Sequence, residues 1–184
     1  MELVKHKENI FTIDGFWTKQ TCEDLIAKSE AVGYEEATVT TKNGQMMLKE
    51  VRNNDRVLYH DEVLATTIWE ALEPFAPSKF GNSKAIGLNE LFRFYKYQAG
   101  QQFKKHRDQS YVRNETEASY FTFMIYLNDG YEGGETTFQD FSINPKQGTA
   151  LIFQHHLLHA GTEVKQGVKY VLRTDIMYRL DASF

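Results

Sequence analysis

The sequence predicts an α+β fold in which a sandwich or barrel of short strands carries helices on its outside. Apolar residues recur at helical spacing before about residue 88, whereas short alternating runs separated by turn residues dominate after it. The 184 residues contain no internal repeat, low-complexity tract or Pro/Gly-rich linker. We therefore expect one domain over residues 1–184, with helical support in 1–87 and a β core in 88–180.

Two helices are expected in the first half, after a short strand over residues 10–16. Thr18 is suited to cap the first helix, which ends at Gly33. The second helix runs from about Asp61 to Leu72, and Pro74 stops it.

The second half predicts six strands, each bounded by turn residues. They are Leu88–Tyr97, Tyr120–Asn128, Glu135–Phe138, Thr149–Phe153, Leu157–Val164 and Lys169–Tyr178. In Tyr120–Asn128 the odd-numbered residues are apolar and suited to packing, while the even-numbered ones are mixed and carry hydroxyls. A barrel interior lined in this way indicates a ligand cavity.

Composition excludes several classes of protein. The net charge of −4, from 21 basic and 25 acidic residues, argues against nucleic acid as the main partner. No apolar run approaches the roughly 20 residues that span a bilayer, and no apolar signal-peptide segment is seen, so we expect no membrane association. The single cysteine, Cys22, excludes an internal disulfide and is expected to be a buried, inert thiol. A reducing compartment, most simply the cytoplasm, follows; the oligomeric state is not indicated.

A metal site is predicted from one carboxylate and several imidazoles. On an extended strand His106 and Asp108 point to the same side. More imidazoles follow in Gln154–His159, and two histidines with one carboxylate form the facial set of non-haem Fe(II) oxygenases. Such a set leaves three positions open, two for a 2-oxo acid and one for dioxygen. Taken alone, the His-x-Asp pair is also compatible with a surface ion pair.

A basic residue strengthens this hypothesis. Lys169 lies ten residues after His159, in an apolar strand where an ammonium is costly without an anionic partner such as the distal carboxylate of 2-oxoglutarate. His155 and Lys165 are also ten residues apart, so spacing alone does not choose between the two pairs.

The second half resembles the prolyl 4-hydroxylase family of 2-oxoglutarate oxygenases. The resemblance covers about residues 89–180 in the family's order and spacing. It is carried by Phe94–Gly100, His106-Arg107-Asp108, Tyr126-Leu127-Asn128, Gly133–Phe138, His159–Thr162 and Gly167–Tyr170. It implies a double-stranded β-helix (a cupin-like jelly roll), buttressed by N-terminal helices. The activity it implies is an Fe(II)- and 2-oxoglutarate-dependent dioxygenase that uses O2, for which the family also suggests ascorbate.

The resemblance assigns roles to single residues. It implies that His106, Asp108 and His159 bind iron and that Lys169 binds the 2-oxoglutarate C5 carboxylate. It also implies that Tyr97 and Tyr126 line the cosubstrate pocket; for Tyr97, an aromatic that only packs inside the barrel is the alternative. Ala160-Gly161 after His159 fits the family pattern, which leaves His155 and His156 as supporting or rim residues.

The role of Arg173 and the identity of the substrate have more than one interpretation. Arg173 shares a strand face with Lys169, and we expect it to contact substrate, to support the iron site or to pair with a neighbouring strand. His-Ala-Gly departs from relatives that carry an acidic residue at the middle position, and the peptide-binding domains of collagen-type enzymes are absent. The substrate is therefore a peptidyl proline, a free amino acid or another small metabolite. A non-catalytic metal-binding jelly-roll module is the alternative from another class.

The polar stretch Thr40–Asp55 predicts a hairpin or mobile loop, because Asn43-Gly44 favours a tight turn. Long loops between supporting elements often close over active sites. We expect this stretch to cover the barrel mouth and to offer apolar contact through Met46, Met47 and Leu48. Arg52 and Arg56 would then bind polar parts of the substrate; a static hairpin with these arginines in surface ion pairs is the alternative.

Overall fold

The computed structural model describes residues 1–37, 39–41, 44–46 and 51–181, with backbone alone for 39–41 and 44–46. Its helices are α1 (Lys19–Val32) and α2 (Glu62–Leu72). The strands of the first half are β1 (Glu2–Lys7), β2 (Ile10–Asp14), β3 (Glu35–Glu36), β4 (Val39–Thr41), β5 (Gly44–Met46), β6 (Asp55–His60), β7 (Lys79–Phe80) and β8 (Ser83–Leu88). Those of the second half are β9 (Leu91–Tyr97), β10 (Phe103–His106), β11 (Glu117–Tyr126), β12 (Glu132–Gly133), β13 (Thr136–Thr137), β14 (Ser142–Ile143), β15 (Ala150–Gln154), β16 (His159–Gly161), β17 (Val164–Gln166) and β18 (Lys169–Leu180).

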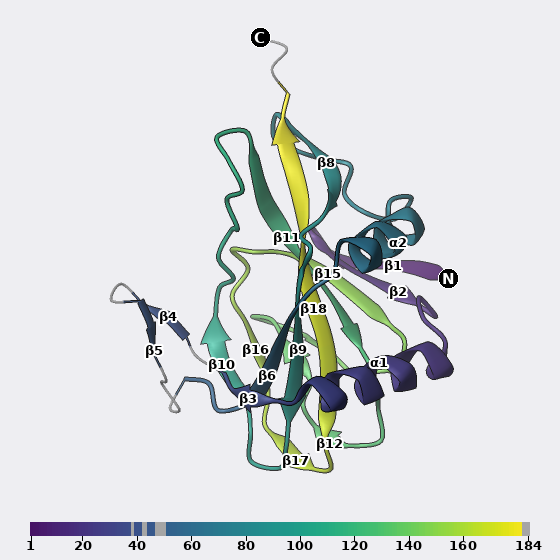
Figure 1. Cartoon of the computed structure of the whole chain (residues 1–184), viewed down its shortest axis with the longest axis vertical. Coiled ribbons are helices and arrows are strands. Elements are labelled where there is room, and N and C mark those ends of the chain that lie inside the picture. The colour runs from purple at the N-terminus through teal and green to yellow at the C-terminus, as the bar shows by residue number, and fades with distance from the viewer. Residues whose placement is uncertain (38, 42–43, 47–50, 182–184) are drawn as a thin grey trace.

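One large antiparallel sheet forms the frame of the molecule. Its strands follow the order β1-β2-β15-β11-β18-β9-β6-β3, and β8 pairs with the far end of β18. The long strands β11 and β18 lie at its centre and bring the second half of the chain together (Figure 1).

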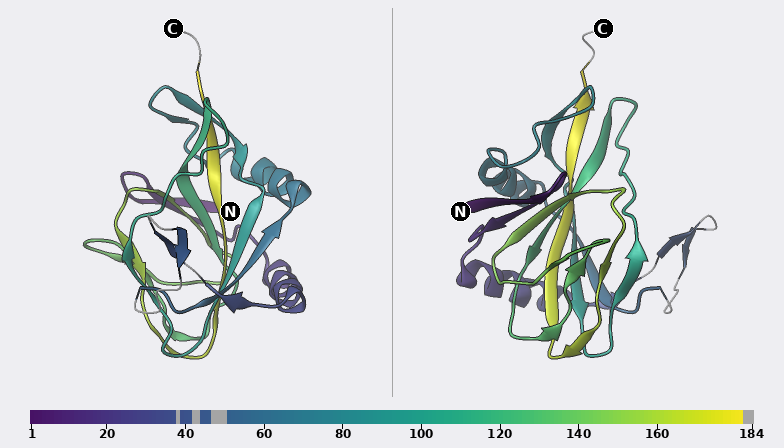
Figure 2. Two further views of the ribbon diagram at one scale, coloured as in Figure 1. Left: turned by 60° about the vertical axis from the view of Figure 1, so that its left-hand side comes forward. Right: turned by 180° about the vertical axis from the view of Figure 1, so that it is seen from behind.

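A smaller sheet in the order β10-β16-β13-β14 lies on one side of this frame (Figures 1 and 2). Buried side chains of the large sheet, such as Tyr95 and Tyr126, meet Phe138, Ile143 and Val164 in a shared cluster. Two antiparallel sheets joined in this way are the jelly-roll arrangement. The catalytic candidates lie in this space.

Both helices lie on the opposite side of the large sheet (Figures 1 and 2). The Thr18 hydroxyl accepts the Thr21 N–H, and the Asp61 carboxylate accepts the Leu64 N–H, so both expected N-terminal boundaries are confirmed. Gly33 ends α1 with φ of 93°, a conformation that favours glycine. The odd-numbered face of β11, from Phe121 to Leu127, packs in the core on this side. Cys22 is buried there as predicted.

The first half is less helical than expected. It holds both predicted helices, but it also supplies β1, β2, β3, β6 and β8 to the large sheet. The missed strands carry weak hydrophobic patterns: β1 is exposed along most of its length, and only Val57 of β6 is buried. They are strands because neighbouring strands provide hydrogen-bond partners, not because of their own periodicity.

Two predicted strands of the second half were wrong in extent. The run Leu157–Val164 is divided into β16, which pairs with β10 and β13, and the start of β17, which pairs with β12. The run Glu135–Phe138 is reduced to the two residues of β13. Gly133 and Gly134 before it have positive φ, which turns the chain before pairing begins.

The stretch between the helices contains a hairpin, as the Asn43-Gly44 pattern predicts. β4 and β5 pair, and they stand out from the body beside β10 (Figures 1 and 2). Met47 and Leu48 lie outside the described residues, and so does the side chain of Met46.

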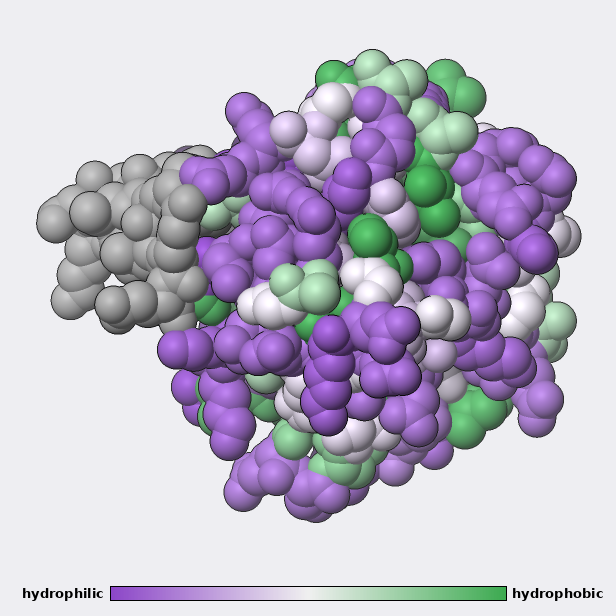
Figure 3. All heavy atoms as spheres, turned by 90° about the horizontal axis from the view of Figure 1, so that it is seen from below, coloured by the Kyte–Doolittle hydropathy of each residue, from purple (hydrophilic) through white to green (hydrophobic). Residues whose placement is uncertain are grey.

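The molecular surface at the end near β12 and β17 is mostly hydrophilic, with small separate hydrophobic patches (Figure 3). Within the described part of the chain, neither helix is long and apolar enough to cross a bilayer.

Candidate metal centre and cosubstrate pocket

The three predicted iron ligands come together at the edge of the small sheet. His106 and His159 are direct partners in the antiparallel pairing of β10 and β16, and Asp108 follows two residues after His106. Asp108 oxygens lie 3.6 Å from His106 Nε2 and 3.8 Å from His159 Nε2. One ligand atom from each residue lies within 4.8 Å of the others, a spacing at which one ion can meet all three.

Backbone contacts orient both imidazoles. The Nδ1–H of His106 donates to the Lys104 carbonyl at 2.7 Å, and that of His159 donates to the Leu157 carbonyl at 2.9 Å. Because a carbonyl only accepts, Nδ1 carries the proton in each ring and Nε2 is left as the metal-binding atom. The Phe103 ring stacks on His106 with centroids 3.5 Å apart.

The charges of the site suit a divalent cation. Burial alone would raise the pKa of Asp108, but the Arg173 guanidinium and the two imidazoles hold it well below its ordinary value. Burial lowers the pKa of His159 to about 4, partly opposed by Asp108, so this imidazole is neutral near pH 7. Two imidazole nitrogens and a carboxylate fit Fe(II).

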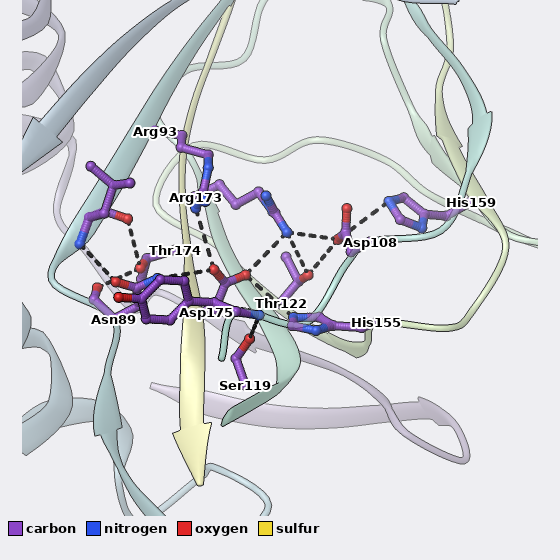
Figure 4. Close-up of polar contacts among 12 residues, drawn as sticks. Asn89, Arg93, Asp108, Ser119, Thr122, His155, His159, Arg173, Thr174 and Asp175 are labelled. Carbon is purple, nitrogen blue, oxygen red and sulfur yellow. Dashed lines mark hydrogen bonds and ion pairs between the residues drawn. The ribbon is translucent and has the colours of Figure 1, made fainter. Parts of the chain in front are cut away.

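A buried network of hydrogen bonds and ion pairs orients the Asp108 carboxylate (Figure 4). Arg173 Nη2 lies 3.1 Å from an Asp108 oxygen and 3.1 Å from an Asp175 oxygen. Asp175 also lies 3.3 Å from Arg93 Nη1 and 3.3 Å from His155 Nε2, and Thr122 donates a hydrogen bond to Asp108. Of the three roles considered for Arg173, this position matches support of the metal site.

Lys169 lies deeper between the sheets, at the start of β18. It is 3% exposed, and its ammonium donates to the Gly134 carbonyl at 2.6 Å. Its Nζ lies 5.2 Å from the Tyr97 ring and 5.6 Å from the Tyr126 ring. Burial lowers its pKa to about 8, opposed by Glu135, and no ion pair joins it to a carboxylate of the described residues. A buried ammonium without a counterion fits an anionic ligand.

An inner cavity of about 50 Å³ connects these groups. His106, Asp108 and His159 line it together with Tyr97, Lys169 and Arg173. Tyr126 stands behind this wall, and its hydroxyl is hydrogen-bonded to that of Thr136 at 2.7 Å. The expected cosubstrate residues are thus in contact with one another, although Tyr126 is not itself part of the cavity lining.

The remaining candidate residues of the site differ in burial and in position. His155 is buried and contacts Asp175, whereas His156 and Lys165 are exposed. Arg52 and Arg56 line a second, wider cavity that shares His106, Asp108 and Arg173 with the inner one. Arg52 is 6% exposed, so the alternative of a surface ion pair was wrong for it.

Sequence reasoning missed Thr122, Asp175 and Phe103 as parts of the site. Asp175 lies two residues after Arg173, and the same alternation that placed Arg173 would have found it. Thr122 was placed on the polar face of its strand, but its contact depends on the register that sets it opposite Asp175.

Comparison with known proteins agrees with this geometry. The family model described as the 2OG-Fe(II) oxygenase superfamily matches residues 92–174. The probable prolyl 4-hydroxylase 8 of Arabidopsis thaliana is 25% identical over 213 residues, which cover 92% of this chain and 69% of that protein. The probable prolyl 4-hydroxylase 3 of the same plant is 24% identical, with the same coverage.

Solved structures share the fold at low identity. The viral collagen prolyl hydroxylase from Paramecium Bursaria Chlorella virus-1, solved as a 2OG complex, aligns with a TM-score of 0.65 and 21% identity, covering 93% of this chain and 96% of that one. A prolyl hydroxylase from Trichoplax adhaerens, in complex with a hypoxia inducible factor peptide fragment, gives a TM-score of 0.71 and 14% identity, covering 94% and 84%. Residues 92–174 are thus similar to the 2OG-Fe(II) oxygenase superfamily, and the chain as a whole is similar to prolyl 4-hydroxylases.

Proposed function

We propose that this oxygenase hydroxylates a proline of a peptide, with Fe(II) held by His106, Asp108 and His159. The observation that carries the proposal is one cavity that contains both a facial ligand set and a buried, unpaired ammonium at Lys169. A non-catalytic jelly-roll module has no need of that combination, since an unpaired buried lysine is costly. The prolyl 4-hydroxylases among the relatives, and the peptide bound to the Trichoplax enzyme, favour a peptidyl proline as substrate.

When bound, Fe(II) and 2-oxoglutarate supply the oxidation: with O2, the oxo acid is converted to succinate and CO2 as one C–H bond becomes C–OH. Lys169 binds the C5 carboxylate, and the phenols of Tyr97 and Tyr126 flank it. Arg173 and Thr122 fix the Asp108 carboxylate so that it remains a metal ligand.

Part of the wall of the inner cavity is apolar. Met124, Phe153 and Val171 line it, and each is at most 9% exposed. Apolar walls of this kind strengthen the contact between Lys169 and a carboxylate.

Succinate release tests the function. Proline-containing peptides and free amino acids are screened with Fe(II), 2-oxoglutarate and O2, and we expect release that depends on a peptide. Succinate formed with free amino acids or other metabolites, and not with peptides, would instead support a small-molecule hydroxylase. As a test independent of turnover, 2-oxoglutarate is expected to raise the melting temperature only when a divalent metal is present.

Two finer expectations accompany the function. Ascorbate is expected to sustain turnover, as in the resembling family, and its omission from the assay tests this. A reducing, cytoplasmic location is inferred from the single cysteine Cys22.

A further inference from the structure

The wider cavity beside the metal site is lined by an excess of positive charge. It measures about 330 Å³ and opens next to His106 and Asp108. Five arginines and two aspartates line it: Arg52, Arg56, Arg93, Arg107, Arg173, Asp108 and Asp175. Among the described residues, the two aspartates are the only carboxylates in this lining.

Both aspartates are already paired. Asp175 contacts Arg93, Arg173 and His155, and Asp108 contacts Arg173 and belongs to the proposed ligand set (Figure 4). Since a bound divalent metal would add positive charge, the cavity is more cationic in the working enzyme.

Arg52 is a buried member of this group to which the described residues offer no carboxylate partner. It is buried, and its guanidinium stacks against two aromatic rings, 4.2 Å from that of Tyr95 and 4.5 Å from that of Phe103. Its Nε donates to the Asn54 amide oxygen at 2.6 Å, but its buried Nη2 has no hydrogen-bond partner. Within the described part of the chain, no carboxylate pairs with it.

The fold holds this guanidinium in place. The backbone of Arg52 pairs with that of Phe103 at the start of β10, and the Phe103 ring lies between Arg52 and His106. Only the Phe103 ring therefore separates the Arg52 guanidinium from His106, a proposed metal ligand. The positive electrostatic potential of the cavity affects Tyr95. Burial would raise the pKa of its phenol, but Arg52, Arg173 and Arg93 lower this pKa to about 8.

We propose that the arginine-lined cavity binds a carboxylate of the prime substrate, with Arg52 as the buried anchor. An unpaired buried guanidinium is costly in the free protein and becomes favourable once an anion supplies its missing partner. The inference deepens the proposed function and rests on it: Lys169 takes the carboxylate of the cosubstrate, and Arg52 takes that of the substrate. The carboxylate belongs either to an acidic residue beside the proline or to a free acid.

Matched peptides test the proposal on the enzyme loaded with Fe(II) and 2-oxoglutarate. The probes are acetyl-Gly-Pro-Glu-amide and acetyl-Glu-Pro-Gly-amide, each with its Gln counterpart, and N-acetylproline with N-acetylprolinamide. Binding is measured without oxygen by calorimetry, and hydroxylation is measured with oxygen. We expect at least one acid to bind roughly 10- to 100-fold more tightly than its amide, because a charge-assisted hydrogen bond to a buried group is lost.

Variants connect that preference to Arg52. Arg52→Met keeps apolar contact with the rings but removes the charge, and it is expected to bring acid and amide to within about twofold of each other. Arg52→Lys retains part of the preference, and Lys19→Met, which removes an exposed charge on α1, leaves it unchanged.

Each outcome decides something. Equal affinity for every acid and amide pair, or no binding of any acid, overturns the carboxylate site. An Arg52→Met enzyme with a raised KM for 2-oxoglutarate but an intact acid preference also overturns it, because Arg52 would then serve the cosubstrate. Binding and hydroxylation of N-acetylproline but of no peptide keeps the carboxylate site and refutes the peptide substrate of the proposed function.

Discussion

At the scale of single residues, we propose different roles for His155 and His159 because their contacts differ. His159 pairs with His106 across β10 and β16, whereas His155 lies at the end of β15 and reaches Asp175. Both are buried, so burial does not distinguish them. The partner of each ring decides which one is able to bind metal.

The first prediction concerns these imidazoles. His159→Ala and His106→Ala are expected to abolish turnover and to weaken metal binding strongly, because each removes one of three ligands. His155→Ala is the matched control and retains the metal. Titration with Fe(II) or Co(II) measures binding; an active His159→Ala enzyme beside an inactive His155→Ala enzyme would show that the distal ligand is wrongly assigned.

The second prediction concerns Lys169. Lys169→Ala is expected to weaken 2-oxoglutarate binding by about 2–4 kcal/mol, because a buried charge-assisted pair is lost. Metal binding should survive, since Lys169 is not a ligand. The KM for 2-oxoglutarate measures the effect, and an unchanged KM would move the role to Arg173.

The third prediction is a pH dependence. The pKa of Lys169 is about 8 in the free protein, so the ammonium is present below that pH and is lost above it. A carboxylate binds the ammonium, so 2-oxoglutarate affinity is expected to fall by up to about tenfold per pH unit above pH 8. Calorimetry between pH 7 and about 9.5 tests this.

Lys169→Arg is the control for that titration. A guanidinium remains charged throughout this range, so the variant should show a flat profile. A slope that is the same in both proteins would assign the titration to another group.

Not all of the site was predictable at this scale. The proposed ligands and Lys169 were assigned from the resemblance to the prolyl 4-hydroxylase family. The contacts among Arg173, Asp175 and Thr122 could not be predicted, because they depend on how β11 and β18 align. A shift of one residue would turn each of these side chains to the other face.

At the scale of elements, the hairpin of β4 and β5 is the feature with the most direct link to substrate capture. It is joined to Arg52 through residues 47–51 and stands beside β10, which carries His106. The hairpin stands out from the body of the molecule (Figures 1 and 2), and the stretch Thr40–Asp55 that contains it is mostly polar.

The fourth prediction concerns this hairpin. Shortening the chain between Lys42 and Lys49 is expected to raise the KM for the prime substrate, because we propose that this stretch covers the substrate. Uncoupled decarboxylation of 2-oxoglutarate should remain nearly intact, since Lys169 and the metal ligands are untouched. A parallel loss of both activities, or hydrogen exchange as slow in the hairpin as in the strands, argues against a lid.

The elements also show where sequence patterns are informative. β9, β11 and β18 were predicted because their sequences are rich in apolar and aromatic residues. In the structure, most residues of these strands are buried or half-buried. β1, β6 and β8 were missed because they lie toward the margins of the sheet, where one face meets solvent or a helix. At such positions, pairing with a neighbour outweighs propensity.

At the scale of the whole molecule, the large sheet separates two buried regions. One face packs on the helices through a mostly apolar core, and the other packs on the small sheet and contains the site. Stability and chemistry are thus supported by opposite faces of the same strands.

The fifth prediction tests that separation. Phe123 is 1% exposed and meets the Phe16 ring, just before α1, with centroids 5.5 Å apart. Phe123→Ala is expected to lower the free energy of unfolding by about 3–5 kcal/mol through the cavity it leaves. The folded variant should keep its KM for 2-oxoglutarate, because Met124 and not Phe123 faces the pocket.

Urea denaturation measures the loss of stability. Val63→Ala, an exposed change on α2, is the control and should shift the free energy by no more than about 0.5 kcal/mol. A Phe123→Ala protein with normal stability, or one with wild-type folding but impaired cosubstrate binding, would show that the two faces are not separate.

The central strand β18 also fixes the separation between the backbones of two residues of the proposed site. It pairs with β9 from Lys169 to Arg173 and with β11 from Val171 onward, so its residues keep a spacing of about 3.3 Å along the strand. One end of this stretch holds the ammonium that we propose binds the far carboxylate, and the other holds the guanidinium beside Asp108. The backbone at Lys169 and at Arg173 cannot shift along the strand without breaking backbone hydrogen bonds. We therefore expect diacids that are one carbon shorter or longer than 2-oxoglutarate to bind more weakly.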